Sequence, residues 1–285
     1  DGKGTPKVLN DEQIVPFYLA NGATMPEALD YAGSGCIESR LVNRETQVTG
    51  NSLINYGAVV EMTLRDGRVK FWNDAQFGLH TGDPRTFQGF DDVWRAFCAQ
   101  LEQVVRHIMT QQYVALELKP RHFAAPFASM LHDLASQECM DLHRHGEHIP
   151  GGIDLSCIES VGKGTAIDSL AAIKHLVYDT KQLTWDQLLD AIECNWEGRE
   201  AIRQLCLNAP KYGNGIDWVD QIGFDIEHFI LDFIHRHPKP HGQSFMLRCI
   251  PVTIHVPTGR VGGAPPSGGP AGEYLSEGIS PSRGR

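Results

Sequence analysis

The spacing of apolar positions predicts a chain in which helices outnumber strands. From Asp91 to Ile108 apolar residues recur every three or four positions, while Asp92, Arg95 and Glu102 occupy the opposite side. This period predicts a helix that packs one face against a core. The same period, interrupted by Gly and Pro, predicts further helices at residues 165–178, 184–196, 200–208 and 218–234.

The N-terminal third is predicted to be a series of short elements. A short strand is expected before a helix that begins near Asn10, whose side chain can cap exposed backbone amides. A brief helix is expected at 25–31, with Pro26 in its first turn, where proline is tolerated. Apolar positions from Leu53 to Leu64 predict a helix that ends before the Asp66-Gly67 turn, and a short strand is expected at 69–72.

Residues 245–256 form a run with the β-branched content of a buried strand. Strands recurring between helices favour an α/β architecture with a parallel component. Cys249 lies in this run and is expected to be part of the core.

Composition and charge narrow the class of protein. Of 285 residues, 41% are hydrophobic and 21% charged, which is ordinary for a globular chain that buries a sizeable core. The net charge of −10 is spread along the chain, and no basic block alternates with aromatic residues, so binding of nucleic acid is not expected. No apolar run approaches the roughly 20 residues of a membrane helix.

Seven cysteines, an odd number without a CxxC pair, favour a reducing, cytoplasmic location. The chain begins without Met and closes on a Gly-, Pro- and Ser-rich stretch from 257 to 285. We therefore expect it to be part of a larger polypeptide.

The most informative candidate for chemistry is the segment Gly33-Ser34-Gly35-Cys36-Ile37-Glu38. Small residues let a backbone approach a substrate closely. In an extended Cys-x-Glu segment the two side chains point to the same side. A thiol and an acid/base group would then share one pocket.

The tetrapeptide Cys-Ile-Glu-Ser occurs twice, beginning at Cys36 and again at Cys157. The first copy follows Gly-Ser-Gly, whereas the second leads through Gly162-Lys163-Gly164 into a predicted helix. This context favours the first copy as the site.

Further motifs occur in a definite order along the chain. They are Lys7-Val8-Leu9-Asn10-Asp11, Gly35-Cys36-Ile37-Glu38, Thr81-Gly82-Asp83-Pro84, the segments 164–174 and 208–214, and Val261-Gly262-Gly263-Ala264-Pro265-Pro266-Ser267-Gly268 followed by 275–282. In this order they resemble the glycyl radical enzymes, the family of pyruvate formate-lyase and its dehydratase and lyase relatives.

The resemblance implies a fold and a mechanism. The fold is an α/β barrel of ten strands with surrounding helices, in which the cysteine lies on an internal loop. A glycyl radical, installed by an iron–sulfur activating enzyme that uses S-adenosylmethionine, converts the cysteine to a thiyl that abstracts a hydrogen atom from a small substrate. Cys36 would be that thiol and Glu38 the general base. The full-length protein would be a homodimer, and no cofactor or metal is expected in this chain.

The chain departs from the family pattern at its C-terminal end. An Arg-Val-x-Gly-Tyr glycyl loop is absent, and Ser267-Gly268-Gly269 replaces the more usual Asp-Gly-Arg. Residues 1–285 would thus be the C-terminal half of the barrel, incomplete and without the glycyl radical domain. The chain alone is expected to be inactive, and a truncated or non-enzymatic interaction module is the rival hypothesis.

The Cys-x-Glu pattern resembles the eliminating members of the family and lacks the adjacent cysteines of pyruvate formate-lyase. Ser39-Arg40 after the glutamate resembles the sulfonate lyases, which implies C–S cleavage of an isethionate-like substrate with release of sulfite. The alternatives are a glycerol or diol dehydratase and another C–O, C–N or C–C lyase of the same family.

Five further residues are candidates for the substrate pocket. Thr49 and Asn51 follow the cysteine loop and either line the pocket or cap a helix. Arg248, Ile250 and His255 lie in the predicted strand; Arg248 would offer a cation to a sulfonate, and His255 is either a pocket residue or a satisfied core histidine.

Two other groups of residues have simpler interpretations. His132, His143, His145 and His148, with nearby acids, match no structural zinc spacing, so no metal site is expected. The Gly-rich stretch 259–272 lacks the Lys-Ser/Thr of a phosphate-binding loop and is expected to be a packed loop.

Overall fold

The structure is a computed structural model that describes residues 10–34, 38–46, 52–145, 148–237, 244–250 and 253–281. The chain divides into two compact units. Unit 1 comprises Asp1–Ser52, Met109–Ile158 and Pro238–Leu247, and unit 2 comprises Leu53–Ile108, Glu159–His237 and Arg248–Arg285. Each unit is described by itself.

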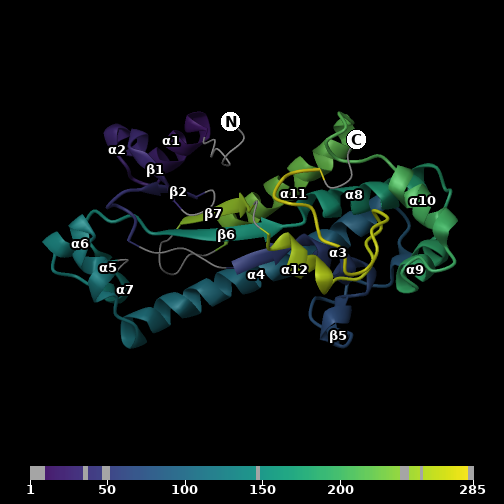
Figure 1. The fold of residues 1–285 in the computed structure, drawn as a ribbon, viewed down its shortest axis with the longest axis horizontal. Coiled ribbons are helices and arrows are strands. Elements are labelled where there is room, and N and C mark those ends of the chain that lie inside the picture. The colour runs from purple at the N-terminus through teal and green to yellow at the C-terminus, as the bar shows by residue number, and fades with distance from the viewer. Residues whose placement is uncertain are drawn as a thin grey trace. The chain divides into compact units, whose positions relative to one another are not determined.

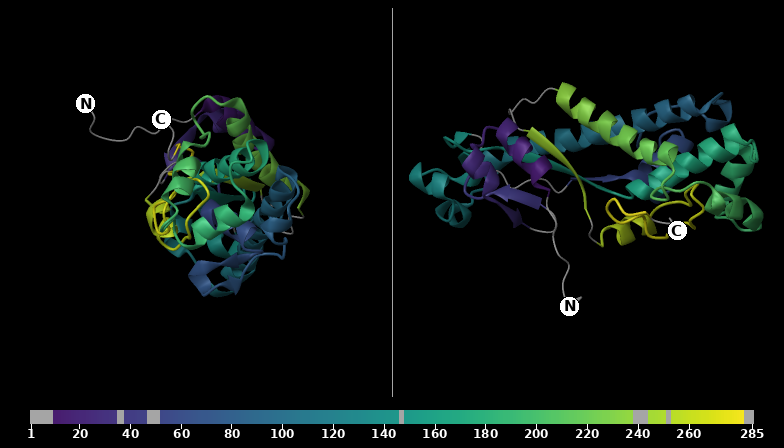
Figure 2. Two further views of the ribbon diagram at one scale, coloured as in Figure 1. Left: turned by 90° about the vertical axis from the view of Figure 1, so that its right-hand side faces the viewer. Right: turned by 90° about the horizontal axis from the view of Figure 1, so that it is seen from above.

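Unit 1 combines short helices with one hairpin. Its elements are α1 (Asp11–Ala20), α2 (Met25–Leu29), β1 (Tyr31–Ser34), β2 (Glu38–Leu41), α5 (Pro126–Met130), α6 (Asp133–Gln137) and α7 (Leu142–His145). The core of this unit gathers Tyr18, Leu41, Ile153, Leu155 and Met246, which are at most 9% exposed. Figures 1 and 2 show the hairpin beside α1 and α2.

Local signals explain the first two helices. Asn10 caps α1 by accepting a hydrogen bond from the amide of Glu12, as the sequence predicted. A capping box between Thr24 and Glu27 starts α2, with the proline in its first turn. The predicted helix at 25–31 is two residues too long, because Tyr31 pairs with Leu41 in β1.

Unit 2 is mainly helical. Its elements are α3 (Tyr56–Leu64), β4 (Arg68–Val69), the 3₁₀ turn η1 (Lys70–Trp72), β5 (Ala75–Gln76), the 3₁₀ turn η2 (Pro84–Thr86), α8 (Lys163–Ile173), the π-helical turn η4 (Lys174–Asp179), α9 (Trp185–Glu193), α10 (Glu200–Asn208), α11 (Asp217–Arg236) and α12 (His255–Arg260).

Helix α8 is the centre of unit 2, and every one of its residues is buried. It packs against α3 and α11 (Figure 1). The absence of a side chain at Gly223 lets α11 approach closely, since a Cβ there would lie 2.9 Å from Ile167. At the start of α8, Thr165 and Ser276 exchange two hydrogen bonds of 3.0 and 2.9 Å, which fix the C-terminal loop to the helix.

Four elements contribute residues to both units: β3 (Ser52–Asn55), α4 (Phe90–His122), β6 (Leu155–Val161) and β7 (Ser244–Cys249). The strands form a sheet in the order β3-β6-β7. The amide of Ser244 donates to Asp154 and that of Ile250 to Ser160, so β6 and β7 advance in the same direction. This confirms the predicted α/β architecture with a parallel component.

Several predicted boundaries are wrong. Leu53 and Ile54 lie in strand β3, not in a helix, and the side chain of Asn55 caps α3. The strand expected at 69–72 is only Arg68–Val69, followed by the turn η1.

The longest helix and the last strand also differ from prediction. Helix α4 continues beyond Ile108 to His122. The strand expected at 245–256 ends at Cys249, and His255 is the first residue of α12.

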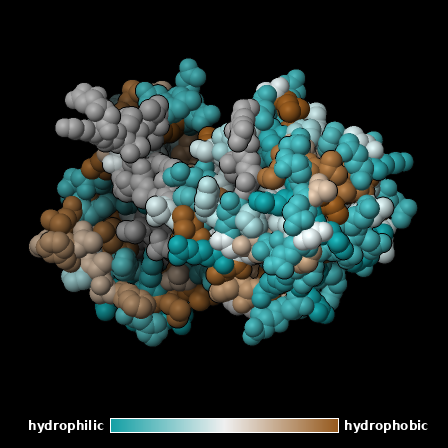
Figure 3. Space-filling view, turned by 45° about the vertical axis from the view of Figure 1, so that its right-hand side comes forward, coloured by the Kyte–Doolittle hydropathy of each residue, from teal (hydrophilic) through white to brown (hydrophobic). Residues whose placement is uncertain are grey.

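Hydrophobic side chains also reach the surface among the hydrophilic ones (Figure 3). In unit 1 the exposed apolar residues around α5 are Phe123, Phe127, Met130 and Leu131. Within the described residues, no helix is both long and apolar enough to cross a membrane.

Candidate functional site

The hairpin of unit 1 carries the predicted reactive segment. Strands β1 and β2 are antiparallel, with Tyr31 opposite Leu41 and Ser34 opposite Glu38. Residues 35–37, which include Cys36, and the side chain of Glu38 lie outside the described part of the structure. In the sequence, Cys36 falls between Ser34, the last residue of β1, and Glu38, the first residue of β2.

The base of the hairpin is held by Glu45. Its carboxylate accepts hydrogen bonds from Arg40 at 2.5 Å, from the amide of Leu41 at 3.0 Å and from the hydroxyl of Tyr18 at 3.1 Å. The Tyr18 hydroxyl also lies 3.0 Å from the Oγ of Ser39. Three consecutive residues of β2 are therefore linked, directly or through Tyr18, to one carboxylate.

The backbone of the same segment is joined to the core of unit 1. Glu45 forms a parallel β-bridge with Ile153, whose amide donates to Arg44 and whose carbonyl accepts from Thr46. His132 Nε2 lies 3.2 Å from the carbonyl oxygen of Glu45. The support of the hairpin thus rests on a buried part of the unit.

Sequence reasoning missed Tyr18 and Glu45. Glu45 is 27 residues from Tyr18, and the two meet only because α1 packs beside the hairpin. No periodic or motif signal marks such a pair.

Unit 2 contains three of the predicted pocket residues. Arg248 is half-buried near the end of β7, and its carbonyl accepts a hydrogen bond from the Oγ of Ser160 at 3.0 Å. Ile250 is 7% exposed and its amide donates to Ser160. His255 is half-buried at the start of α12, where its ring meets that of Tyr274 edge to face at 6.0 Å between centroids. The expectation that His255 lies in a buried strand is therefore wrong.

The partly buried thiol of Cys249 adjoins these residues. The Oγ of Ser160 lies 3.3 Å from the Sγ of Cys249, and burial raises the pKa of this thiol. Burial likewise raises the pKa of Tyr56, which is fully buried. A protonated, uncharged form suits the core position of Tyr56, whereas Cys249 is only partly buried, so the expectation that Cys249 belongs to the core is wrong.

The remaining predicted pocket residues are Thr49 and Asn51, which lie outside the described residues. The neighbouring Asn55 caps α3 by accepting from the amide of Ala58 at 3.1 Å.

The second tetrapeptide lies within the described part of the chain, whereas Cys36 of the first copy does not. Cys157 is 1% exposed in the central strand β6. A side chain packed inside a sheet is poorly placed to meet a substrate.

The histidine-rich segment of unit 1 has structural contacts. His132 caps α6 by accepting from the amide of Ala135, and the amide of Asp141 donates to His145. Among the residues that the structure describes, no cluster of His, Cys, Asp or Glu has the arrangement of a metal site.

The Gly-rich stretch is a packed loop, as predicted. Ser267 is 2% exposed, Trp196 donates to the carbonyl of Gly269 at 2.7 Å, and Arg203 donates to that of Gly268 at 3.0 Å. Gly268 has a φ of +96°, a conformation that favours glycine.

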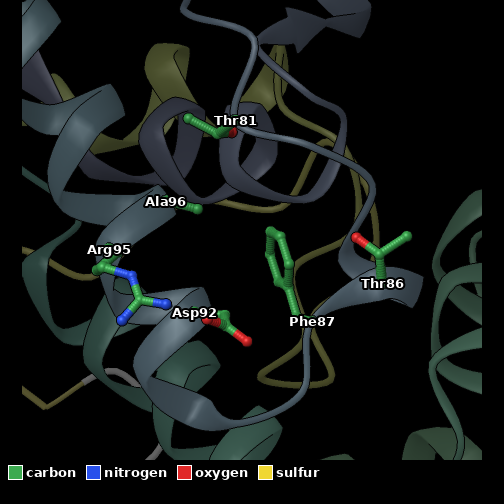
Figure 4. A pocket seen from close by; sticks show the side chains of 6 residues that line it. All are labelled: Thr81, Thr86, Phe87, Asp92, Arg95 and Ala96. Atoms are coloured by element: carbon green, nitrogen blue, oxygen red, sulfur yellow. Dashed lines mark hydrogen bonds and ion pairs between the residues drawn. The ribbon is translucent and has the colours of Figure 1, made fainter.

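A separate open cavity of about 360 Å³ lies at the start of α4 in unit 2. Its lining residues are Thr81, Thr86, Phe87, Asp92, Arg95 and Ala96 (Figure 4). Asp92 and Arg95 form an ion pair with each other. None of the predicted site residues lines this cavity.

This chain is similar to known proteins across the hairpin and the later motifs. A family model described as pyruvate formate lyase-like matches residues 1–259. The chain is 44% identical over 283 residues to the isethionate sulfite-lyase of Bilophila wadsworthia, covering 99% of this chain and 34% of that protein. It is 33% identical over 284 residues to the trans-4-hydroxy-L-proline dehydratase of Clostridioides difficile, covering 99% and 35% respectively.

A solved structure is also similar to this chain. The glycerol-bound form of the B12-independent glycerol dehydratase from Clostridium butyricum matches with a TM-score of 0.87 and 29% identity, covering 99% of this chain and 35% of that chain. The chain therefore belongs to the pyruvate formate lyase-like family of glycyl radical enzymes, as the resemblance predicted. It spans about a third of the length of the curated relatives it matches.

Proposed function

We propose that the protein containing this chain is a glycyl radical lyase that cleaves the C–S bond of a small hydroxy-sulfonate, such as isethionate, and releases sulfite. The observation that carries the proposal is the 44% identity to an isethionate sulfite-lyase across 99% of this chain. The identity to the hydroxyproline dehydratase over the same span is 33%. The Cys-Ile-Glu-Ser-Arg sequence of the hairpin adds support from the residues themselves.

Cys36 and Glu38 are the proposed catalytic residues. A glycyl radical would supply the unpaired electron to the site. Cys36, as a thiyl, would take a hydrogen atom from the hydroxyl-bearing carbon of the substrate. Glu38 would accept the hydroxyl proton, and the electron density left on oxygen would favour expulsion of sulfite from the adjacent carbon. The resulting carbon radical would take a hydrogen atom back from the Cys36 thiol.

The hairpin suits this division of tasks. In the sequence, Cys36 follows small residues between the two strands, while Glu38 begins a strand that is anchored at its base. A hydrogen-atom abstractor needs a fixed position near its substrate, and a general base must lie within hydrogen-bond reach of the proton it accepts.

The anionic group of the substrate requires donors. Arg248 would contribute a cation to the sulfonate, because charge-assisted hydrogen bonds to oxyanions are strong. Thr49, Asn51, Ile250 and His255 would line the remainder of the pocket. Activation by an iron–sulfur enzyme that uses S-adenosylmethionine, a homodimeric assembly and a cytoplasmic location complete the proposal.

A glycerol or diol dehydratase is the second candidate. The TM-score of 0.87 to the glycerol-bound dehydratase favours it, because the two backbones agree over nearly the whole of this chain. The same hairpin would then expel water instead of sulfite.

The test is an anaerobic assay of the full-length protein with an activating enzyme. Isethionate, glycerol and trans-4-hydroxy-L-proline are supplied separately, and sulfite and carbonyl products are measured, with electron paramagnetic resonance to confirm radical formation. Sulfite release from isethionate alone would support the proposal. A protein that carries the radical and converts only glycerol would favour the dehydratase.

A further inference from the structure

The carboxylate of Glu45 is almost completely enclosed, yet it has no direct place in the proposed chemistry. Its side chain is 4% exposed, compared with 20% for that of Arg40. An ionised carboxylate is costly to bury unless donors surround it. Here Arg40, the Leu41 amide and the Tyr18 hydroxyl provide those donors, and two of the three belong to β2.

The Tyr18 hydroxyl extends this network to Ser39. A phenol has one proton, so when it donates to Glu45 the hydroxyl of Ser39 can donate to the phenol oxygen 3.0 Å away. Ser39 is 8% exposed and Tyr18 is fully buried. The carboxylate of Glu45 is thus linked, directly or through Tyr18, to each of the three residues after Glu38, namely Ser39, Arg40 and Leu41.

A two-stranded hairpin of this length is marginal without such support. β1 and β2 have four residues each. A slip of one residue in their register would turn every side chain of β2 to the other face. Glu45 opposes this slip, since it is itself fixed by the β-bridge to Ile153, which lies in the core of unit 1.

We infer that Glu45 is a positioning residue for Cys36 and Glu38, acting through Tyr18, Arg40 and the Leu41 amide to fix the register of the hairpin. The inference gives a task within the proposed function to a residue that does not touch substrate. The inference depends on the proposed function only for the predicted effect of Glu45 on turnover.

The first test measures the accessibility of Cys36 without any turnover. The full-length protein, not activated, is treated with iodoacetamide, and labelling of each cysteine is followed by peptide mass spectrometry. Glu45→Gln removes the charge at nearly constant size. Glu193→Gln is the matched control, because this glutamate pairs with Arg65 and Lys70 at the surface of unit 2.

Two other thiols report on the rest of the fold. Cys139 is exposed and serves as a reference for the reagent, whereas Cys157 is buried and reacts only when the protein opens. We expect Glu45→Gln to raise the labelling rate of Cys36 by about tenfold through local opening of the hairpin, with Cys139 unchanged and Cys157 protected. Tyr18→Phe should raise it less, and Glu193→Gln not at all.

The second test measures turnover on the activated protein. Glu45→Gln should lower kcat by at least about tenfold with little change in KM, because a displaced base and thiol weaken the chemical step more than binding. The yield of radical should be retained.

Three results would overturn the inference. One is a Cys36 labelling rate that Glu45→Gln leaves unchanged, and another is a rate that rises only together with that of Cys157, which would indicate general unfolding. The third is a wild-type Cys36 that already reacts as fast as Cys139. A protein that releases no sulfite but shows the expected labelling would refute the proposed substrate and leave the positioning role intact.

Discussion

At the scale of single residues, we propose different tasks for two carboxylates seven positions apart. Glu45 is enclosed by three donors and holds the hairpin. Glu38 begins β2 beside the connection that contains Cys36, and we propose it as the base. The described contacts of Glu45 explain its assignment, because all three donors tie its carboxylate to the hairpin or to α1.

Replacing Glu38 by Gln should leave radical formation intact and slow elimination by roughly 10²- to 10⁴-fold, the usual range for loss of a general base. Sulfite release in the activated protein provides the measurement. The second tetrapeptide offers a matched control, since Glu159→Gln alters the same sequence on strand β6. Equal losses in the two variants would contradict the assignment of Glu38.

The buried thiols should differ from the exposed ones in their dependence on pH. Burial raises the pKa of Cys98 from 9.0 to about 12 and that of Cys206 to about 11. At pH 8 we expect iodoacetamide to label Cys206 about a hundredfold more slowly than a free thiol of ordinary pKa, because the thiolate is the reactive form. Labelling at equal rates would show that these sites are open to solvent.

The same pKa shifts affect stability. A thiol whose folded pKa is raised contributes fully to stability below its unfolded pKa, near 9, and this contribution is lost as the pH rises towards the folded value. The free energy of unfolding should therefore decrease between about pH 9 and pH 11, the range set by Cys206. Urea unfolding at several pH values measures this decrease.

At the residue scale the Gly-Ser-Gly before Cys36 favoured the first tetrapeptide over the second, and this choice stays a prediction. Cys157, in the second copy, is buried. Glu45 could not be found from such a local signal, because its contact with Tyr18 forms only when α1 packs beside the hairpin.

At the scale of elements, helices with a sustained apolar period were predicted well. The bounds of α10 agree with prediction, and α11 differs by one residue at its start and two at its end. The predicted end of helix α4 was too early because few buried apolar residues follow Met109. Leu116 is the buried apolar residue of its last turns. The backbone of the helix continues where the apolar period does not.

Strand boundaries were harder to predict, since a short apolar run fits either a strand or a helix. Leu53 and Ile54 were assigned to a helix, although Asn55 as a capping residue marks where the helix begins. In the run 245–256 the proline at position 251 was an unused signal, because proline is unfavourable within a central strand.

Gln100 joins helix α4 to the preceding loop and provides a prediction at this scale. Its amide nitrogen donates to the carbonyl of Leu79 at 2.7 Å, and its oxygen accepts from the Leu79 amide at 2.9 Å. Gln100→Leu should destabilise the protein by about 2 kcal/mol, since it leaves backbone groups without partners. Gln111→Leu, at an exposed position of the same helix, should change stability by less than about 0.5 kcal/mol. Urea unfolding that ranks the two variants equally would contradict this role.

At the scale of the whole molecule, the described elements form two compact units, and the family match covers residues 1–259. The hairpin belongs to unit 1, whereas Arg248, Ile250 and His255 belong to unit 2. This chain corresponds to about a third of the length of its curated relatives. The sequence motifs identified the family because they occur along the chain in the order that the family shows. This order can be read without knowing how the two units are placed.

The most direct measurement compares Cys36→Ala with Cys157→Ala in the activated full-length protein, recording the glycyl radical signal and sulfite release from isethionate. The account predicts that Cys36→Ala forms the radical but releases no sulfite. Cys157→Ala, which removes a buried sulfur, should lose about 1 kcal/mol of stability and keep its turnover. Loss of turnover in Cys157→Ala with activity retained in Cys36→Ala would show that the other copy of the tetrapeptide carries the chemistry.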